Sequence, residues 1–423
     1  MENERKDIKY YATRDIKLEN LIHLVNKENL KEQHRKQQKN RASGIDRVTK
    51  EEYDKNLEDN LGNLINRMKK FSYKPLPVRR AYIPKPNGKL RPLGIPAYED
   101  KLVQGVMADI LNEIYECKFL ECSYGFRPNK NCHQAIKVIN QRIMINKVNY
   151  ILDCDIKGFF DNVNHEWLMK FLEHDIKDKA FLRYINRFLI SGYIEDMKYY
   201  ETDKGTPQGG LISPILANVY LHYVLDLFFE KKIKPSLKGE AYLVRYADDF
   251  IIMFQYENEA KEVYQMLIER LAKFGLEMDQ EKTRILPFGR FKGTKETFDF
   301  LGFMHYNGIT RTGKYTVGHK MSKKKKKLKH QAITKWIKEN RSLNAFELIK
   351  KLNRKLIGMY AYYGINGMTN ELYKLYYHTK HILINALAKR SQRKKTLRHM
   401  LCIFKVIPIE KPKIYKDIWC WSI

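Results

Sequence analysis

The chain has 423 residues, of which 43% are hydrophobic and 12% aromatic, so it can form two or three folded domains and is not a disordered protein. Its net charge of +30, from 79 Lys and Arg against 49 Asp and Glu, indicates a polyanionic partner, and nucleic acid fits better than an anionic membrane surface. No stretch approaches the roughly 20 apolar residues of a membrane-spanning helix. The N-terminus opens no apolar signal-peptide core, and the six cysteines lack zinc-site spacing. We therefore expect a cytoplasmic protein that does not bind membranes.

The positive charge is concentrated near the C-terminus. Residues 320–423 contain 26 Lys and Arg against 5 Asp and Glu, a net charge of +21, which leaves +9 for the first 319 residues. This distribution predicts a moderately basic body followed by a strongly basic C-terminal quarter.

The order of the predicted elements favours an α+β fold. Residues 1–70 are rich in Lys, Glu, Asn and Leu and predict helices, with a break at residues 43–46. Residues 78–96 predict a β-hairpin, because Asn87-Gly88 lies between two short apolar runs. Further helices are predicted at 99–115, 130–145, 164–190, 213–228 and 257–274. Strands are predicted at 149–155 and 282–286, a strand pair around 298–303, and helices again from 320 onward. Strands alternating with helices in this way predict a mixed or antiparallel sheet with helices around it.

Asp248 and Asp249 lie between two apolar, aromatic and β-branched runs that predict a second hairpin. Adjacent carboxylates repel each other, which a bound divalent cation would relieve, although a solvated turn is the alternative. Asp155 ends the strand predicted at 149–155. If the two strands are neighbours in one sheet, the three carboxylates converge, as a two-metal phosphoryl-transfer site requires. A strand-end or helix-capping role is the alternative for Asp155 alone.

Three ordered motifs resemble the palm motifs of reverse transcriptases: 155–161 (Asp-Ile-Lys-Gly-Phe-Phe-Asp), 205–209 (Gly-Thr-Pro-Gln-Gly) and 246–249 (Tyr-Ala-Asp-Asp). Further stretches resemble group II intron reverse transcriptases in particular, namely 43–46, 90–96, 99–101, 123–128, 211–218 and 300–303. The resemblance runs from about residue 40 to the C-terminus. It implies a right-hand polymerase with an N-terminal helical extension at 1–70, fingers and palm with an antiparallel sheet at 71–315, and a basic α-helical thumb/maturase domain at 316–423.

The resemblance also implies catalytic and metal-binding roles. Asp155, Asp248 and Asp249 would be the catalytic carboxylates. Together with the backbone carbonyl of Ile156 they would hold two Mg²⁺ ions, for which Mn²⁺ can substitute. Asp248 would be the bridging ligand and Asp249 the supporting one.

The same resemblance implies five nucleotide-binding residues. Phe160 would lie under the incoming sugar and select dNTPs over rNTPs, and Gln208 would pack on the nucleotide. Lys85 and Arg91 would bind the triphosphate, and Lys282 matches the position proposed to donate a proton to the leaving pyrophosphate. The residues alone leave alternatives open. Phe160 could be a core phenylalanine, Lys85 and Arg91 could be surface charges of a hairpin, and Lys282 could be an exposed strand lysine.

The C-terminal part resembles the thumb and maturase region at 352–363 and 390–394. The candidate RNA-binding residues are Lys323, Lys324, Lys325, Lys326, Arg354, Tyr362, Arg393 and Lys394. The alternatives are a solvated helix face for the lysine run and helix core for the tyrosines. We expect no cysteine-paired endonuclease module of the kind that some relatives carry, since Cys402 and Cys420 do not supply one.

The predicted function is that of an RNA-directed DNA polymerase that also binds its intron RNA to promote splicing and mobility. Its partners would be an RNA template, the intron RNA, a DNA or RNA primer and dNTPs, and the protein would be a monomer or weak homodimer. Three alternatives remain: a splicing maturase without polymerase activity, a related reverse transcriptase recruited to phage defence, and an RNA-dependent RNA polymerase, against which Phe160 argues.

Overall fold

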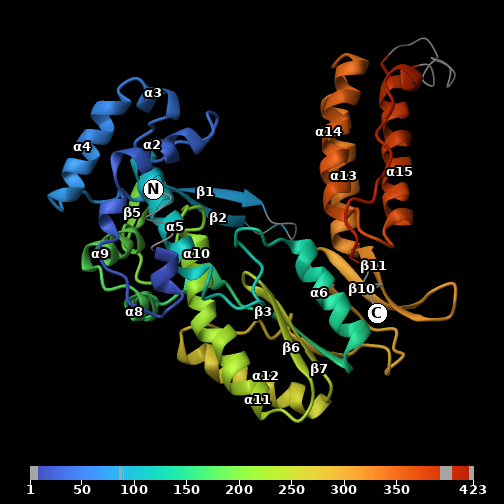
Figure 1. Ribbon diagram of the computed structural model, residues 1–423. Helices are drawn as coiled ribbons and strands as arrows, with labels where there is room; N and C mark the ends of the chain where they lie inside the picture. The colour runs from blue at the N-terminus through green and yellow to red at the C-terminus, as the bar shows by residue number, and fades with distance from the viewer. Residues whose placement is uncertain (1–7, 85–87, 89, 391–402, 419–423) are drawn as a thin grey trace. The chain divides into compact units, whose positions relative to one another are not determined.

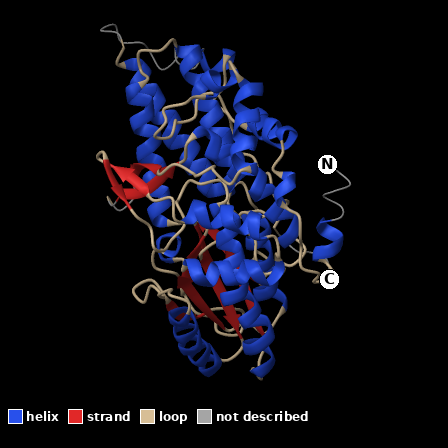
Figure 2. Ribbon diagram, turned by 90° about the vertical axis from the view of Figure 1, so that its left-hand side faces the viewer, coloured by secondary structure: helices blue, strands red, loops and turns tan. Residues whose placement is uncertain are grey.

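The structure is a computed structural model that describes residues 8–84, 88, 90–390 and 403–418 (Figure 1). It divides into two compact units. Unit 1 is drawn from residues 1–131, 152–252 and 256–285, and unit 2 from residues 132–151, 253–255 and 286–423. Figure 2 shows the helices in blue and the strands in red. Both kinds of element occur in each unit, which confirms the predicted α+β class.

Unit 1 begins with helices that pack on a long buried helix. They are α2 (Lys27–Lys36), α3 (Lys50–Asp54) and α4 (Leu57–Lys69), preceded by a 3₁₀ turn at Ile22–Leu24, and the long helix is α5 (Tyr98–Tyr115). Thr49 and Glu52 form a reciprocal capping box that starts α3. Gln33 and Arg67 then tie the first helices to α5 through Asp109 at 2.7 Å and Glu99 at 2.5 Å. The predicted N-terminal helices are confirmed.

The hairpin predicted at 78–96 is also confirmed, as β1 (Val78–Pro84) paired antiparallel with β2 (Leu90–Ile95), while Asn87 of its predicted turn lies outside the described residues. A second hairpin, β4 (Tyr193–Glu195) with β5 (Lys198–Tyr200), was not predicted. Its strands have three residues each, and its turn places Asp196 and Met197 at positive φ without glycine or asparagine, so the usual sequence signal is absent. Because β4 pairs parallel with β1, the sheet β2-β1-β4-β5 is mixed.

The second sheet of unit 1 has the order β6-β7-β3-β8. Its strands are β3 (Tyr150–Asp155), β6 (Ala241–Tyr246), β7 (Asp249–Phe254) and β8 (Arg284–Pro287). The helices are α7 (Phe159–Asn162), α8 (His165–Asp175), α9 (Lys179–Leu189), α10 (Ser213–Leu221) and α12 (Glu257–Lys273). The single helix predicted at 213–228 is interrupted: α10 continues into π-helical turns at His222–Asp226 and Phe229–Ile233 and then into α11 (Lys234–Ser236).

Unit 2 contains α6 (Cys132–Ile145) and an antiparallel sheet of order β11-β10-β9. The strands are β9 (Thr297–Phe300), β10 (Phe303–Ile309) and β11 (Tyr315–Met321), of which β11 was not predicted. Helices follow among the described residues, as predicted from residue 320 onward: α13 (Lys323–Glu339), α14 (Ala345–Tyr363) and α15 (Thr369–Ala388).

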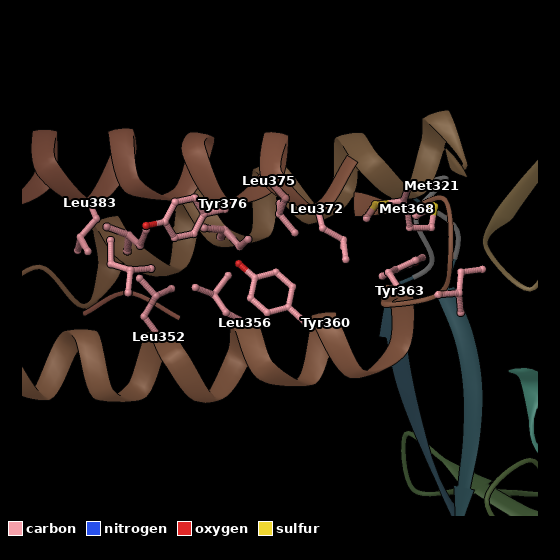
Figure 3. Packing of buried hydrophobic residues seen from close by; sticks show 14 of the residues in the cluster. Met321, Leu352, Leu356, Tyr360, Tyr363, Met368, Leu372, Leu375, Tyr376 and Leu383 are labelled. Atoms are coloured by element: carbon pink, nitrogen blue, oxygen red, sulfur yellow. The ribbon is translucent and has the colours of Figure 1, made fainter. Parts of the chain in front are cut away.

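The core of unit 2 lies where α14 faces α15. Figure 3 shows Leu352, Leu356 and Tyr360 of α14 pointing toward Leu372 and Leu375 of α15, and all five are buried. The core interpretation of the thumb tyrosines therefore holds for Tyr360. Within the described ranges, no helix is both long and apolar enough to cross a membrane.

Candidate active site

One cavity of unit 1, about 560 Å³ in volume, gathers most of the predicted catalytic and nucleotide-binding residues. Its lining includes Asp155, Ile156, Asp248, Arg91, Phe160, Gln208 and Lys282. These residues come from widely separated parts of the sequence, so the fold brings them together. Of the predicted catalytic and nucleotide-binding residues, Asp249 is not part of this lining, and Lys85 lies outside the described residues.

The sheet explains how two carboxylates reach one cavity. Asp155 is the last residue of β3, and Asp248 lies in the two-residue turn between β6 and β7. Because β7 and β3 are neighbours in the sheet, the end of β3 and this turn meet at the same edge. The expectation that the two strands are neighbours is confirmed.

The two carboxylates repel each other across the cavity. Burial raises the pKa of Asp248, and the Asp155 carboxylate raises it further, while Arg91 and Arg245 act in the opposite direction. A cation between the two carboxylates would relieve this repulsion. Carboxylate and carbonyl oxygens are also the ligands that Mg²⁺ prefers, so the residues present fit that ion.

Asp249 differs from the prediction in its position, because it is the first residue of β7 and not part of the turn. It nevertheless lies close to β3. Burial raises the pKa of the Cys154 thiol, and Asp153, Asp249 and Asp155 raise it further. Among the residues that the structure describes, no cluster of three or more His, Cys, Asp or Glu side chains is gathered tightly enough to hold a metal, so the role of Asp249 stays a prediction.

Lys282 lies at the site and forms ion pairs with Asp155 and with Asp279, the latter at 2.5 Å. Burial lowers the pKa of Lys282, but its hydrogen bonds to the two carboxylates outweigh burial and raise the pKa overall. Asp279 also donates its backbone N–H to the Asp155 carbonyl at 2.8 Å. The Asp155 carboxylate thus already accepts a cationic group, which is a second sign that the site suits positive charge.

The glycine-containing loop at 205–210 is clamped against its neighbours. Thr206 donates its backbone N–H to the carbonyl of Phe160 at 2.7 Å, and Gly94 of β2 donates to the carbonyl of Gln208 at 2.7 Å. Gly209 has φ 120°, and a Cβ there would lie 2.6 Å from the Gly94 carbonyl oxygen. The close approach that only glycine permits holds Phe160, Gln208 and β2 together.

The predicted RNA-binding residues of unit 2 lie on helix surfaces. Lys323, Lys324 and Lys325 are exposed in the first turn of α13, Lys326 pairs with Glu371 at 2.9 Å, and Arg354 is exposed on α14. Tyr362 is 36% exposed, donates its hydroxyl to the Leu301 carbonyl at 2.8 Å and stacks on Phe303. Arg393 and Lys394 lie outside the described residues.

Several residues at or near the cavity were given no binding role from the sequence, among them Phe126, Asp161 and Asp279. Phe126 and Asp161 line it, and both belong to motifs already recognised, at 123–128 and 155–161. Asp279 could not be recognised as a site residue from the sequence, apart from its spacing of three residues from Lys282. The buried Arg245 did leave a signal in the sequence, because it is a lone charge in an apolar strand.

The sequence was then compared with known proteins. The family described as "Reverse transcriptase (RNA-dependent DNA polymerase)" matches residues 83–305, more than half of the chain, so the fold is that of a reverse transcriptase. The family described as "Group II intron, maturase-specific domain" matches residues 325–402.

Individual relatives indicate to which kind of reverse transcriptase the chain is similar. The group II intron-encoded protein LtrA of Lactococcus lactis subsp. cremoris is 30% identical over 82% of this chain and 70% of its own length. Protein YkfC of Escherichia coli (strain K12) is 32% identical over 56% of this chain and 71% of its own length. The putative COX1/OXI3 intron 1 protein of Saccharomyces cerevisiae is 32% identical over 53% of this chain and 32% of its own length. The chain therefore belongs to the group II intron reverse transcriptase/maturase family, as the motifs indicated.

Proposed function

We propose that this protein is an RNA-directed DNA polymerase that copies RNA into cDNA by two-metal nucleotidyl transfer. We further propose that it binds its group II intron RNA to promote splicing and mobility. The observation that supports the polymerase activity best is the single cavity shared by Asp155, Asp248, Arg91, Phe160 and Gln208.

In this proposal, Asp155, Asp248 and the carbonyl of Ile156 hold two Mg²⁺ ions, with Asp249 in support and Mn²⁺ as a substitute. When bound, the ions would lower the pKa of the primer 3′-hydroxyl and stabilise the charge that develops on the phosphate and the leaving group. The raised pKa of Asp248 and the ion pair of Asp155 with Lys282 support the need for positive charge between these carboxylates.

The remaining residues of the cavity would bind and select the nucleotide. Arg91, with Lys85 on the same hairpin, would bind the triphosphate, where a guanidinium can grip phosphate oxygens in pairs. Phe160 would exclude a 2′-hydroxyl, and Gln208 would pack on the incoming nucleotide. Lys282, which forms ion pairs with Asp155 and Asp279, would donate a proton to the pyrophosphate leaving group.

The C-terminal region would bind RNA. We propose that residues 71–315 act as fingers and palm, with residues 1–70 as their N-terminal extension. Residues 316–423 would act as a thumb and maturase domain that neutralises RNA phosphates with Lys323 to Lys326, Arg354, Arg393 and Lys394, while Tyr362 stacks on RNA. The exposure of the first lysines of α13 supports this assignment. The partners would be template and intron RNA, a DNA or RNA primer and dNTPs, with the protein a monomer or weak homodimer.

Primer extension tests the polymerase proposal. We expect the purified protein to extend a DNA primer on an RNA template with dNTPs and Mg²⁺ or Mn²⁺. Absence of extension with either ion would contradict the proposal. If the same protein still promoted splicing of an intron RNA, the maturase alternative without polymerase activity would take its place.

A further inference from the structure

Arg245 lies on β6, three residues before Asp248, and is completely buried. Burying a guanidinium costs several kcal/mol unless its charge and its donors are all satisfied. Arg245 does not line the catalytic cavity, so metal, nucleotide or RNA binding does not account for it. The hydrogen-bond partners of Arg245 indicate its role.

All five N–H donors of Arg245 are used. Nε and Nη2 bind the two carboxylate oxygens of Asp226 at 2.7 and 2.5 Å. Nη1 donates to Oδ1 of Asn218 at 3.1 Å, and Nη2 donates to Oγ of Ser123 at 2.8 Å. The remaining bond runs from Nη1 to the backbone carbonyl of Ala247 at 3.1 Å. We call Arg245, Asp226, Asn218 and Ser123 the Arg245 cluster.

The bond to Ala247 connects the cluster with the catalytic turn. The Ala247 carbonyl belongs to the peptide that immediately precedes Asp248. Ala247 has φ 59°, in the left-handed region, which is unfavourable for a residue with a Cβ. The hydrogen bond from Arg245 stabilises the peptide in this unfavourable conformation.

Gly125 packs against the same turn. A Cβ at Gly125 would lie 2.4 Å from the Ala247 nitrogen, so the two backbones are in direct contact. Nδ2 of Asn218 donates to the Gly125 carbonyl at 2.7 Å, while its Oδ1 accepts from Arg245. Asn218 therefore joins the cluster to the backbone that packs on the turn.

The cluster also accounts for the π-helical turn at His222–Asp226. Asn218 and Asp226 are eight residues apart, and in a regular α-helix their side chains would point about 80° away from each other. The additional residue of a π-helical turn removes most of this offset. Both side chains can then reach the same guanidinium.

We propose that the Arg245 cluster is a positioning device that holds the Ala247–Asp248 peptide in its left-handed turn and thereby sets the Asp248 carboxylate in the catalytic cavity. The proposal rests on the polymerase function proposed above. Arg245 is a positioning residue because it acts through Asp248 and touches neither the substrate nor the cavity.

The test is the double variant Arg245→Met with Asp226→Leu. Replacing a buried ion pair by apolar residues of similar size is often neutral for stability, so we expect a folded protein with a Tm close to that of the wild type. Because a misplacement of about 1 Å can cost 10²-fold in rate, we expect kcat to fall by about 100-fold while KM for dNTP changes by less than about threefold. Adding Ala247→Gly should restore part of kcat, because glycine adopts positive φ without strain.

A matched control is the pair Lys118 and Asp175, 3.0 Å apart and remote in sequence from the turn. The variant Lys118→Met with Asp175→Asn should keep kcat even where it lowers the Tm. A folded Arg245→Met/Asp226→Leu variant with wild-type kcat overturns the proposal. If that variant does not fold, Arg245→Lys takes its place, because lysine keeps the charge but lacks the five donors of the guanidinium. Wild-type kcat in Arg245→Lys would also overturn the proposal.

A second readout separates this proposal from the proposed function. Mn²⁺ binding, followed by electron paramagnetic resonance, should be about tenfold weaker in the double variant, because residues that orient a metal ligand affect affinity by this much. If the wild type does not extend primers, the polymerase proposal fails, and the Mn²⁺ titration still decides the role of the cluster. Unchanged Mn²⁺ affinity overturns the positioning role.

Discussion

The catalytic region of unit 1 and the basic helices of unit 2 use charged residues in opposite ways. Next to the catalytic turn, one buried positive charge is matched by one buried negative charge, since Arg245 pairs with Asp226 at 2.5 Å. On α13, Lys323 to Lys325 follow one another at the surface of a helix whose buried residues are apolar. The first arrangement places atoms precisely, whereas the second supplies a density of positive charge. Substitutions should therefore have large, position-specific effects in the first region and small, additive effects in the second.

The largest effect should come from Asp155→Asn. Removing one carboxylate of a two-metal site removes several kcal/mol of transition-state stabilisation, so single-turnover incorporation should fall by about 10³-fold or more. The control is Asp153→Asn on the same strand, outside the cavity lining. Equal losses of incorporation in both variants would show that the rate depends on the integrity of β3 and not on the Asp155 carboxylate in the cavity.

Gly209→Ala should also be severe, because the new Cβ would lie 2.6 Å from the Gly94 carbonyl in addition to the strain at φ 120°. Gly293 has φ 58° but open space around it, so Gly293→Ala isolates the strain alone, of order 1–2 kcal/mol. We expect Gly209→Ala to lower both the Tm and the incorporation rate further than the control does. Similar Tm values for the two variants would mean that the loop is not clamped as described.

Phe160→Ala tests the sugar gate. Removing the ring should raise rNTP incorporation relative to dNTP by about tenfold or more, as expected for a steric discrimination of 1–3 kcal/mol. Phe159 is the matched control, since it is buried beside Phe160 with ring centroids 5.3 Å apart. Phe159→Leu should affect stability without changing the choice of sugar, and an unchanged ratio in Phe160→Ala would refute the gate.

The smallest effect should come from the lysines of α13. Changing Lys323, Lys324 and Lys325 together to Gln should flatten the dependence of log RNA affinity on log salt, by about 0.7–0.9 for each RNA phosphate that these lysines neutralise in the wild type. A matched triple substitution of Lys69, Lys70 and Lys74 in unit 1 serves as the control. If the control flattens the slope as much, the main RNA surface lies elsewhere.

The sequence predicted those parts of the structure that depend on local pattern. The strand that ends at Asp155 and the hairpin that contains Asp248 could be predicted from apolar runs. The family motifs identified Arg91, Phe160 and Gln208, which line the same cavity in the structure. The β4–β5 hairpin was missed because its strands are short and its turn lacks glycine. The π-helical turns were missed because an apolar segment has the same composition with or without an extra residue in a turn.

The Arg245 cluster could not be predicted, because its members meet only in the folded chain. The members of the cluster are far apart in the sequence, and Ser123 is 122 residues away from Arg245. The division of roles between Asp248 and Asp249 stays a prediction. The sequence did not indicate that β7 starts at Asp249 or that Arg245 donates to the Ala247 carbonyl.

The most direct test of the central claim is single-turnover addition of one dNTP to a DNA primer on an RNA template, by the wild type and by Asp248→Asn. We predict incorporation by the wild type in the presence of Mg²⁺ or Mn²⁺. We predict none above background by Asp248→Asn, at an unchanged Tm and with primer–template binding intact. Equal incorporation by the two proteins, or none by the wild type, would contradict the assignment of this cavity as a polymerase active site.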